Sequence, residues 1–165
     1  MAVNADETSL TKADPGALEV PPSLLAAPGY VARRLYQAYL AVWVRTVDAT
    51  LTGPQFAVLT AVNTYPGVDQ GSLASSVALD RSTMADIVRR LEDRGLVLRS
   101  SDAKDGRRKL LHLTELGSAK LSEVNARARE LDELLLRDYT RTQRVRLLDE
   151  LTELAELWEG MAEDS

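Results

Sequence analysis

The side chains best suited to bind a polyanion are gathered in one part of the sequence. Residues 81–113 hold nine Lys and Arg residues against five Asp and Glu residues, although the whole chain of 165 residues has a net charge of −5. Residues 114–165 are acidic, with thirteen acidic and seven basic residues. Because the distribution of charge matters more than its sum, this pattern favours contacts between residues 81–113 and nucleic-acid phosphates.

Two groups of side chains in this segment could contact DNA. A predicted helix, capped by Asp80 or Ser82, turns polar residues outward, and a predicted hairpin with a basic tip follows it. Arg pairs bidentately with guanine, and Ser and Thr bond to base edges or to phosphates. The candidate DNA-binding residues are Arg81, Ser82, Thr83, Asp86, Arg89 and Arg90 on the helix, and Lys104, Arg107, Arg108 and Lys109 on the hairpin.

The hairpin also contains two acidic residues, Asp102 and Asp105. We expect these carboxylates to orient Arg107 by ion pairing rather than to contact DNA. The pattern alone leaves an alternative open, because two helices and a hairpin occur in many small domains. A helix with arginines on one side is often only a solvated surface.

The spacing of apolar residues predicts the elements that would position these side chains. The expected elements are a helix from Gly29 to near Asp48, a second between Thr52 and Tyr65, a third capped by Asp69, a fourth at 81–95, strands at 96–98 and 110–113, and helices from Thr114 and from Thr142. The order helix, tight turn, helix, hairpin is that of a winged helix-turn-helix. The predicted fold class is therefore mainly α with a small β-hairpin wing.

The same spacing assigns inward faces and a domain plan. We expect a flexible N-terminal arm at 1–28, helical segments at 29–50 and 114–165, and a winged helix-turn-helix at 51–113. The expected apolar faces are Val31, Leu35, Ala38, Val42 and Thr46 in the first helix, Leu116, Lys120 (by its stem), Val124, Ala128, Leu131 and Leu135 in the fifth, and Leu148, Leu151, Leu154 or Ala155, Trp158 and Met161 in the sixth.

Several kinds of chemistry are excluded or not expected. The chain has no cysteine, so disulfides, thiolate metal sites and a cysteine redox switch are excluded. His112 is the single histidine, so we expect neither a metal site nor a Ser-His-Asp triad, with carboxylates such as Asp69 and Asp80 left as candidate metal ligands. No apolar run reaches the ~20 residues that a membrane helix needs, and the N-terminus does not resemble a signal peptide. We therefore expect a cytoplasmic protein without a cofactor.

Three stretches resemble the MarR family of bacterial regulators, and the resemblance spans roughly residues 30–160. They read LTGPQFAVLTAV, DQGSLASSVALDRSTMADIVRRLEDRGLVLR and SDAKDGRRKLLHLTELG. The most specific part is a D-x-x-D-x-R wing, here Asp102, Asp105 and Arg107, followed by Leu113-Thr114 and Gly117. The resemblance implies a homodimer held by the first, fifth and sixth helices, which binds a roughly palindromic DNA site.

The resemblance also implies control by a small phenolic or aromatic acid. The segment ARRLYQAYLAVW is similar to family members that control the breakdown of aromatic acids, although those often have a His where Tyr36 stands. Arg33 or Arg34 would pair with the carboxylate of the ligand, since Arg binds carboxylates bidentately. Tyr36, Tyr39 and Trp43 would supply aromatic walls, and Phe56 the floor. The alternative is that the aromatic residues form dimer core and the arginines form surface ion pairs.

The sequence also bears on two other functional classes, a protein-interaction module and an enzyme. A winged helix that only dimerises and binds a protein partner is possible, but the basic hairpin argues against it. The chain has no room for a catalytic domain and carries no glycine-rich cofactor loop, and both observations argue against an enzyme. The sequence leaves open whether the protein represses or activates transcription.

Overall fold

The computed structural model describes residues 18–101 and 108–163, and the chain divides into two units, one ending at Ala38 and one beginning at Tyr39. The first unit contains the short α1 (Pro22–Leu25) and the first half of α2 (Pro28–Thr46). Helix α1 lies within the segment 1–28, which was expected to be a flexible N-terminal arm. Residues 1–17 of that arm lie outside the described residues.

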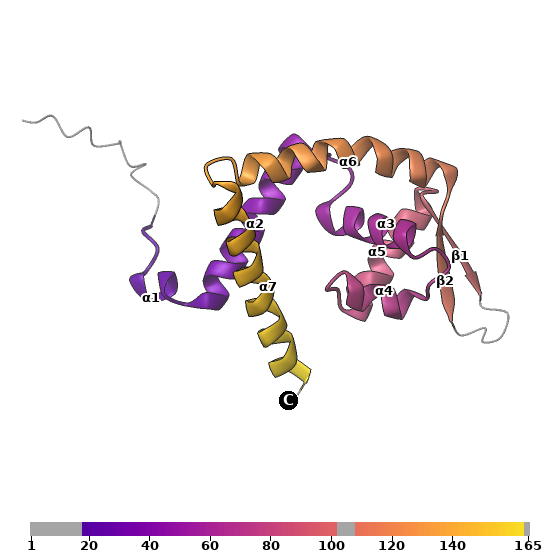
Figure 1. Cartoon of the computed structure of the whole chain (residues 1–165). Helices are drawn as coiled ribbons and strands as arrows, with labels where there is room; N and C mark the ends of the chain where they lie inside the picture. Colours follow the sequence, from indigo (N-terminus) through magenta and orange to yellow (C-terminus); the bar gives the residue numbers. More distant parts are fainter. Residues whose placement is uncertain (1–17, 102–107, 164–165) are drawn as a thin grey trace, which may run out of the picture. The chain divides into compact units, whose positions relative to one another are not determined.

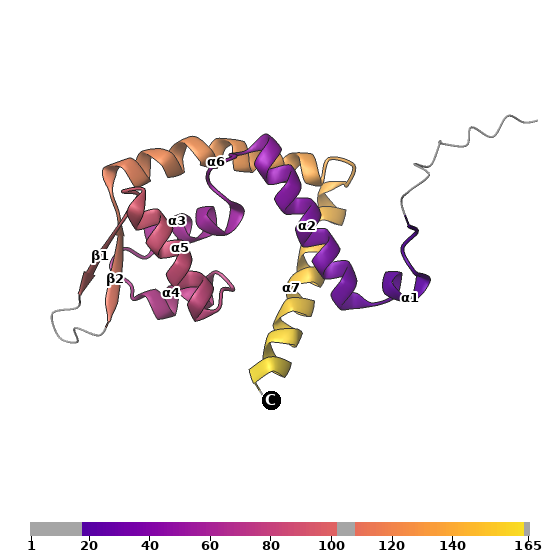
Figure 2. The same ribbon diagram turned by 180° about the vertical axis from the view of Figure 1, so that it is seen from behind.

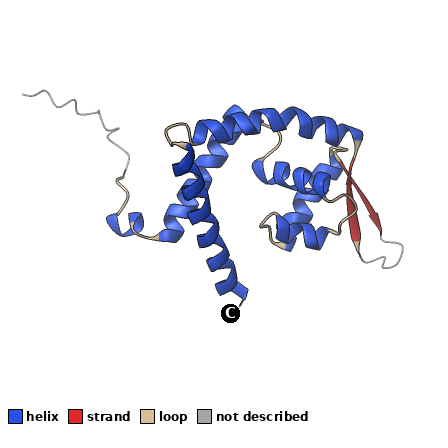
Figure 3. Cartoon of the chain, viewed as in Figure 1, coloured by secondary structure: helices blue, strands red, loops and turns tan. Residues whose placement is uncertain are grey.

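The second unit contains the end of α2 and the remaining elements. These are α3 (Gly53–Thr64), α4 (Gln70–Ser76), α5 (Arg81–Asp93), β1 (Val97–Ser101), β2 (Lys109–Leu113), α6 (Glu115–Leu135) and α7 (Arg141–Glu163). Figure 3 shows the result: the described elements are helices apart from one antiparallel hairpin, which lies at the edge of the second unit. The predicted fold class is confirmed, and each expected element is present within a few residues of its expected bounds.

Side-chain caps begin most of the helices at the places where the sequence carries Thr or Asp. Thr52 caps α3 in a capping box with Gln55, and Asp69 and Asp80 cap α4 and α5. Thr114 caps α6 by accepting from the backbone N–H of Gly117. Each such cap satisfies backbone donors that the helix leaves unpaired and stabilises it by about 1 kcal/mol. Of the two cap candidates for α5, the structure selects Asp80.

The core lies where α3, α4 and α5 pack beside the hairpin and under α6 (Figures 1 and 2). It consists of aliphatic residues and one methionine, with Trp43 from the end of α2 at its border. Its fully buried side chains include Leu51, Leu59, Val62, Leu73, Met84, Val88, Leu91, Val97 and Leu111. This core fixes both the direction of α5 and the base of the hairpin.

The expected inward face of α6 was partly wrong. Val124, Ala128 and Leu131 are buried as expected, but Leu116 and Leu135 are exposed, and Gly117 and Leu121 are buried in addition. The first turn of α6 faces the end of α5, where only a glycine fits. A Cβ on Gly117 would lie 1.9 Å from the backbone oxygen of Leu96.

A short backbone segment before α4 extends the hairpin sideways. The N–H of Gly67 donates to the carbonyl of Leu111, the N–H of Leu111 donates to Val68, and Asp69 forms a bridge with Leu110. Gly67 has a φ of +79°, which favours glycine at this turn. The half-buried ring of His112 lies against Gly67, as expected for a residue at the wing base. These bonds connect the helical part directly to β2.

Two helices expose most of their apolar residues in the single chain. The expected inward face of the first helix was mostly wrong: Val31, Leu35, Ala38 and Thr46 are exposed, and only Val42 is half-buried against the core. In α7, none of residues 141–162 is buried. The exposed apolar side chains of α7 are Val145, Leu148, Leu151, Leu154, Leu157, Trp158 and Met161. No helix within the described ranges is long and apolar enough to span a bilayer.

Candidate nucleic-acid interface

Helix α5 has one buried face and one exposed face. Met84, Ile87, Val88 and Leu91 are buried, at the helical spacing of three and four residues. At the first inward position Met84 is buried, and the neighbouring Ala85 is exposed. The six candidate DNA-binding residues of this helix are all exposed: Arg81, Ser82, Thr83, Asp86, Arg89 and Arg90.

The head of α5 is a hydrogen-bonded cluster around one carboxylate. Asp80 accepts from the hydroxyls of Ser82 and Thr83, both at 2.5 Å, and from the N–H of Thr83 at 2.9 Å. These bonds, first of all those from the two hydroxyls, hold the pKa of Asp80 below its usual value. The cluster fixes the positions of two side chains that could contact DNA.

One turn further along the same face, Asp86 and Arg89 form an exposed ion pair. Their side-chain atoms lie 3.1 Å apart. An exposed pair of this kind contributes little to stability, so the guanidinium can leave the carboxylate for another acceptor.

The turn that joins α4 to α5 has an unusual backbone. Ala78 has a φ of +52°, the one non-glycine residue with a positive φ within the described ranges. The N–H groups of Ala78 and Leu79 donate to Ser75 and Ala74, which closes the turn on the end of α4. This tight turn sets the angle between the two helices, as a helix-turn-helix requires.

The described part of the wing is rigid at its base. The strands pair in register from Val97 with Leu113 to Ser101 with Lys109. The ammonium of Lys109 donates to the hydroxyl of Ser101 at 2.9 Å. Four candidate residues, Asp102, Lys104, Asp105 and Arg107, lie in the segment 102–107, which is outside the described residues, so their roles stay predictions.

Arg108 has a contact that the sequence analysis did not anticipate. Its guanidinium lies 2.8 Å from Asp69, the cap of α4, whose side chain is 20% exposed. The bond from Arg108, together with bonds from Ser72, lowers the pKa of Asp69. Arg108 was expected to contact DNA, and here it connects the wing to the helix-turn-helix. The separation of 39 residues between the partners leaves no local signal in the sequence.

A second set of unanticipated contacts surrounds the α2–α3 loop, residues 47–51. Asp48, with a side chain only 7% exposed, lies 2.8 Å from Lys120 of α6. Arg94, the C-cap of α5, donates to the carbonyl of Thr50 at 2.8 Å. The sequence analysis treated Lys120 as a hydrophobic stem and gave no role to Asp48 or Arg94.

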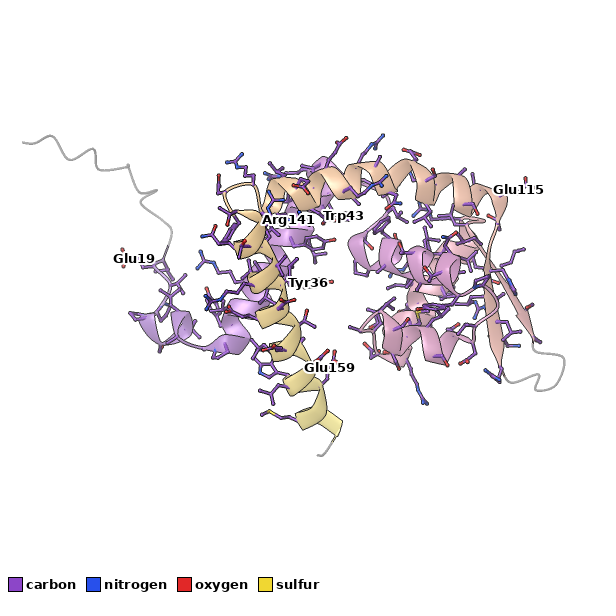
Figure 4. The ribbon with its side chains drawn as sticks, in the orientation of Figure 1. Glu19, Tyr36, Trp43, Glu115, Arg141 and Glu159 are labelled. Atoms are coloured by element: carbon purple, nitrogen blue, oxygen red, sulfur yellow. The ribbon has the colours of Figure 1, made fainter. Side chains whose placement is uncertain are left out.

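The residues proposed for ligand binding fall into both units. In the first unit, Arg33, Arg34 and Tyr36 are exposed, and the Arg33 guanidinium lies 5.8 Å from the centre of the Tyr30 ring. In the second unit, Trp43 (labelled in Figure 4) is 2% exposed and its indole N–H donates to the carbonyl of Leu51. The Trp43 ring contacts the half-buried rings of Tyr39 and Phe56. This environment makes Trp43 a side chain of the core of the single chain, and its expected role as an aromatic wall of a ligand site stays a prediction.

Metal-binding groups are not assembled in the described part of the chain. No cluster there brings three or more His, Asp or Glu side chains together. Asp69 and Asp80, the carboxylates left as candidate ligands, are engaged by Arg108 and by Ser82 and Thr83.

Comparison with known proteins places this interface in a family. The sequence profile described as the MarR family matches residues 51–109. The transcriptional regulator HosA of Escherichia coli is 36% identical over 104 residues, which is 63% of this chain and 76% of HosA. The transcriptional repressor NicR of Pseudomonas putida is 34% identical over 121 residues, which is 73% of this chain and 77% of NicR.

Solved structures agree with the sequence matches. PcaV of Streptomyces coelicolor, in complex with its natural ligand, has a TM-score of 0.78 at 36% identity, over 85% of this chain and 98% of PcaV. BpsR of Bordetella bronchiseptica, whose DNA binding is regulated by 6-hydroxynicotinic acid, has a TM-score of 0.70 at 28% identity, over 77% and 97%. The repressor CouR, bound to a 23-mer DNA duplex, has a TM-score of 0.73 at 27% identity, over 84% and 99%.

Proposed function

Because the chain belongs to the MarR family of DNA-binding transcription regulators, we propose that it is a homodimeric repressor. Two copies of α5 bind a palindromic operator, and a small phenolic or aromatic acid releases the dimer. Regulators of this family are not enzymes, and this chain is not one. The observation that carries the proposal is the exposed face of α5, where arginines and hydroxyl residues stand on a helix whose opposite face is buried.

The exposed face suits the major groove of B-DNA, which admits one α-helix. Thr83 and Arg89 are placed to contact base edges, since Arg pairs with guanine and Thr bonds to either edge. The wing, with Arg107 near its tip in the sequence, supplies sequence-independent contacts to the backbone or minor groove. The relative CouR was solved on a DNA duplex, which supports this use of the fold.

The exposed apolar side chains of α7 support the dimer. Seven large apolar side chains of this helix are exposed in the single chain. Figure 4 shows the helix, with Arg141 labelled near its start and Glu159 near its end. An apolar surface of this extent on a monomer marks an interaction site. A two-fold dimer would place its reading helices about one turn of DNA apart, which predicts a palindromic site.

The effector is proposed from the chemistry of α2 and from relatives. BpsR is regulated by 6-hydroxynicotinic acid, a small aromatic acid. We propose that Tyr39 and Phe56 offer aromatic surface to such a ligand and that Arg33 or Arg34 binds its carboxylate. Tyr36 stays a proposed contact, and Trp43 acts from the core beneath Tyr39 and Phe56. Release requires that the ligand bind more tightly to the dimer conformation that fits DNA poorly.

Selection of DNA from a random pool tests the proposal. The wild-type protein should enrich a palindromic sequence, and its affinity should fall steeply as the salt concentration rises. Arg107→Ala should weaken binding to all sequences, and changes at Thr83 or Arg89 should alter the preferred base. A protein that dimerises but enriches no sequence would contradict DNA reading and indicate a protein-interaction module.

Thermal-shift screening tests the effector. Aromatic acids such as 6-hydroxynicotinate are added at increasing concentration, and a ligand of the native dimer must raise its Tm. Arg33→Gln and Arg34→Gln, tested separately, should identify the carboxylate partner. If every aromatic acid that raises Tm does so equally in both variants and in the wild type, the assignment to these arginines is wrong.

A further inference from the structure

The α2–α3 loop, residues 47–51, is the point where three helices of the second unit are joined by polar contacts. The end of α2 contributes the Trp43 indole, which donates to the carbonyl of Leu51 at 2.6 Å. Helix α6 contributes Lys120, which pairs with Asp48, and Arg127, which donates to the carbonyl of Val47 at 3.2 Å. The end of α5 contributes Arg94, which donates to the carbonyl of Thr50 at 2.8 Å and to its hydroxyl at 3.4 Å.

The loop is also rigid within itself. One oxygen of Asp48 accepts from the N–H groups of Thr50 and Leu51, both at 2.6 Å, and from the Thr50 hydroxyl at 2.8 Å. The other oxygen pairs with Lys120. Val47 and Leu51 are buried on either side of this cluster. Burial by itself would raise the pKa of Asp48, but the hydrogen bonds from Lys120 and Thr50 outweigh it and lower that pKa, so the carboxylate stays charged.

We propose that this loop is a positioning element for DNA reading, with Arg94 as the residue that connects it to α5. The inference rests on the proposed function and deepens it. Arg94 acts through α5 and not by contact with DNA. It holds the C-terminal end of the reading helix to a rigid loop that is itself bound to α2 and α6.

The geometry of α5 makes the position of its C-terminal end important for its head. A helix of 13 residues is about 20 Å long. A tilt of about 6° about one end therefore moves the other end by about 2 Å, whereas binding contacts need placement within about 0.5 Å. Thr83, one of the two residues proposed to contact base edges, stands at the end opposite to Arg94.

Because Arg94 is exposed, its role in positioning α5 can be tested in a variant that still folds. Its side chain is exposed, and its two bonds go to a loop 44 residues away in the sequence. Loss of an exposed hydrogen-bonding side chain costs about 1 kcal/mol or less of folding stability, as the buried face of α5 remains intact. The variant Arg94→Ala should therefore fold, and its defect should appear in how the dimer fits DNA.

The test uses the full-length protein and the palindrome that the wild-type protein selects from random DNA. Two further duplexes carry one base pair more or one less between the half-sites, which moves one half-site by about 3.4 Å and turns it by about 35°. The wild-type protein should bind both altered duplexes at least about a hundredfold more weakly. Arg94→Ala should bind the selected duplex about tenfold more weakly and should discriminate the three spacings less than about tenfold.

Salt dependence distinguishes positioning from a direct phosphate contact. If Arg94 bound a phosphate, Arg94→Ala would reduce the slope of log affinity against log salt by about two, because the dimer carries this residue twice, and Arg94→Lys would restore it. A positioning residue leaves the slope unchanged, and Arg94→Lys does not restore spacing discrimination because a compact ammonium lacks the planar fork whose two nitrogens reach the two oxygens of Thr50. Thr50→Val, which keeps Arg94, should reduce spacing discrimination in the same direction. Arg137→Ala, which removes another exposed arginine, serves as the matched control.

The outcomes separate this proposal from the one on which it rests. A wild-type protein that selects no DNA would overturn the proposed function. If the wild-type protein selects DNA but Arg94→Ala keeps its spacing discrimination, or lowers the salt slope by about two, only the positioning role is overturned. Spacing discrimination lost in Arg94→Ala and Thr50→Val at an unchanged slope supports it.

Discussion

The winged-helix region, residues 51–113, and helix α7 differ sharply in how they bury apolar side chains. Leu51, Leu59, Val88 and Leu111 are fully buried within a single chain. In α7, none of residues 141–162 is buried, although the helix carries as many large apolar side chains as a core helix does. Since burial of apolar surface is the main stabilising contribution, the winged-helix region is stable by its own packing, whereas α7 gains most of its stabilisation only when another surface covers it.

This difference in burial fits the two roles proposed for these regions. The region proposed to read DNA needs a fixed shape, and its core provides that shape. The helix proposed to join the subunits keeps its apolar residues available for the partner. The following variants test the difference between the two regions.

The largest effect is expected at Gly117, where α6 begins beside the winged-helix core. A Cβ at this position would lie 1.9 Å from the oxygen and 2.9 Å from the carbon of the Leu96 carbonyl group, so backbone would have to move. Gly117→Ala should lower the free energy of unfolding by about 4 kcal/mol or more, or prevent folding. Urea denaturation monitored by circular dichroism measures this. Gly160→Ala in α7, where a Cβ meets nothing within 4 Å, is the control and should have no such effect.

The pH dependence of stability tests the α2–α3 loop, which leads into the winged-helix region, through Asp48. Its pKa is lowered from the usual 3.8 in the folded state, so its charge stabilises the fold above about pH 4 and this contribution is lost as the pH falls below that value. Asp48→Asn should cost about 3 kcal/mol at pH 7, because it leaves the largely buried Lys120 without its main partner. Unfolding measured from pH 7 to pH 2 should show a shallower decline in the variant. A decline as steep as in the wild type would contradict the assignment to Asp48.

A matched pair of leucines, one in each region, tests the difference in burial directly. Leu91 is fully buried and Leu151 is 41% exposed. Leu91→Ala should destabilise the protein by about 3 kcal/mol at every protein concentration. Leu151→Ala should cost less than about 1 kcal/mol in the dissociated chain but should raise the dimer Kd. Denaturation at several protein concentrations with sedimentation analysis separates the two effects, and a concentration-independent loss at Leu151 would contradict a dimer role for α7.

The smallest effect is expected at Ala78, in the turn before α5. A φ of +52° disfavours a residue with a Cβ by about 1 kcal/mol, so Ala78→Gly should relieve that strain. The gain should be only a few tenths of a kcal/mol, because glycine also gains freedom in the unfolded chain. A small rise in Tm without change in DNA affinity is the expected result. A fall in Tm would mean that the methyl group of Ala78 is needed for packing.

The sequence predicted the elements well because their signals are local. Apolar spacing located the helices, and Thr52, Asp69, Asp80 and Thr114 marked helix starts at single positions. The outward face of α5 followed from the same spacing. These signals depend on neighbours within one or two helical turns, which a single sequence displays directly.

The predictions that failed or were missing depend on tertiary contacts. In α6, residues 116 and 117 are adjacent, and only the close approach of the Leu96 carbonyl decides that Gly117 is inward and Leu116 is exposed. The contacts of Asp69 with Arg108 and of Thr50 with Arg94 join residues 39 and 44 positions apart. No periodic pattern in the sequence predicts such pairs. The contacts of Arg108 and Arg94 were therefore found only in the structure.

Asp69 has a consequence for how this protein can change over generations. One carboxylate both begins α4 and holds Arg108 at the root of the wing. Replacement of this residue by one that neither caps a helix nor carries a negative charge would weaken the start of α4 and the attachment of the wing together. Diversification of the wing is easier through the strand positions whose side chains face solvent, such as Leu98 and Ser100, than through residue 69.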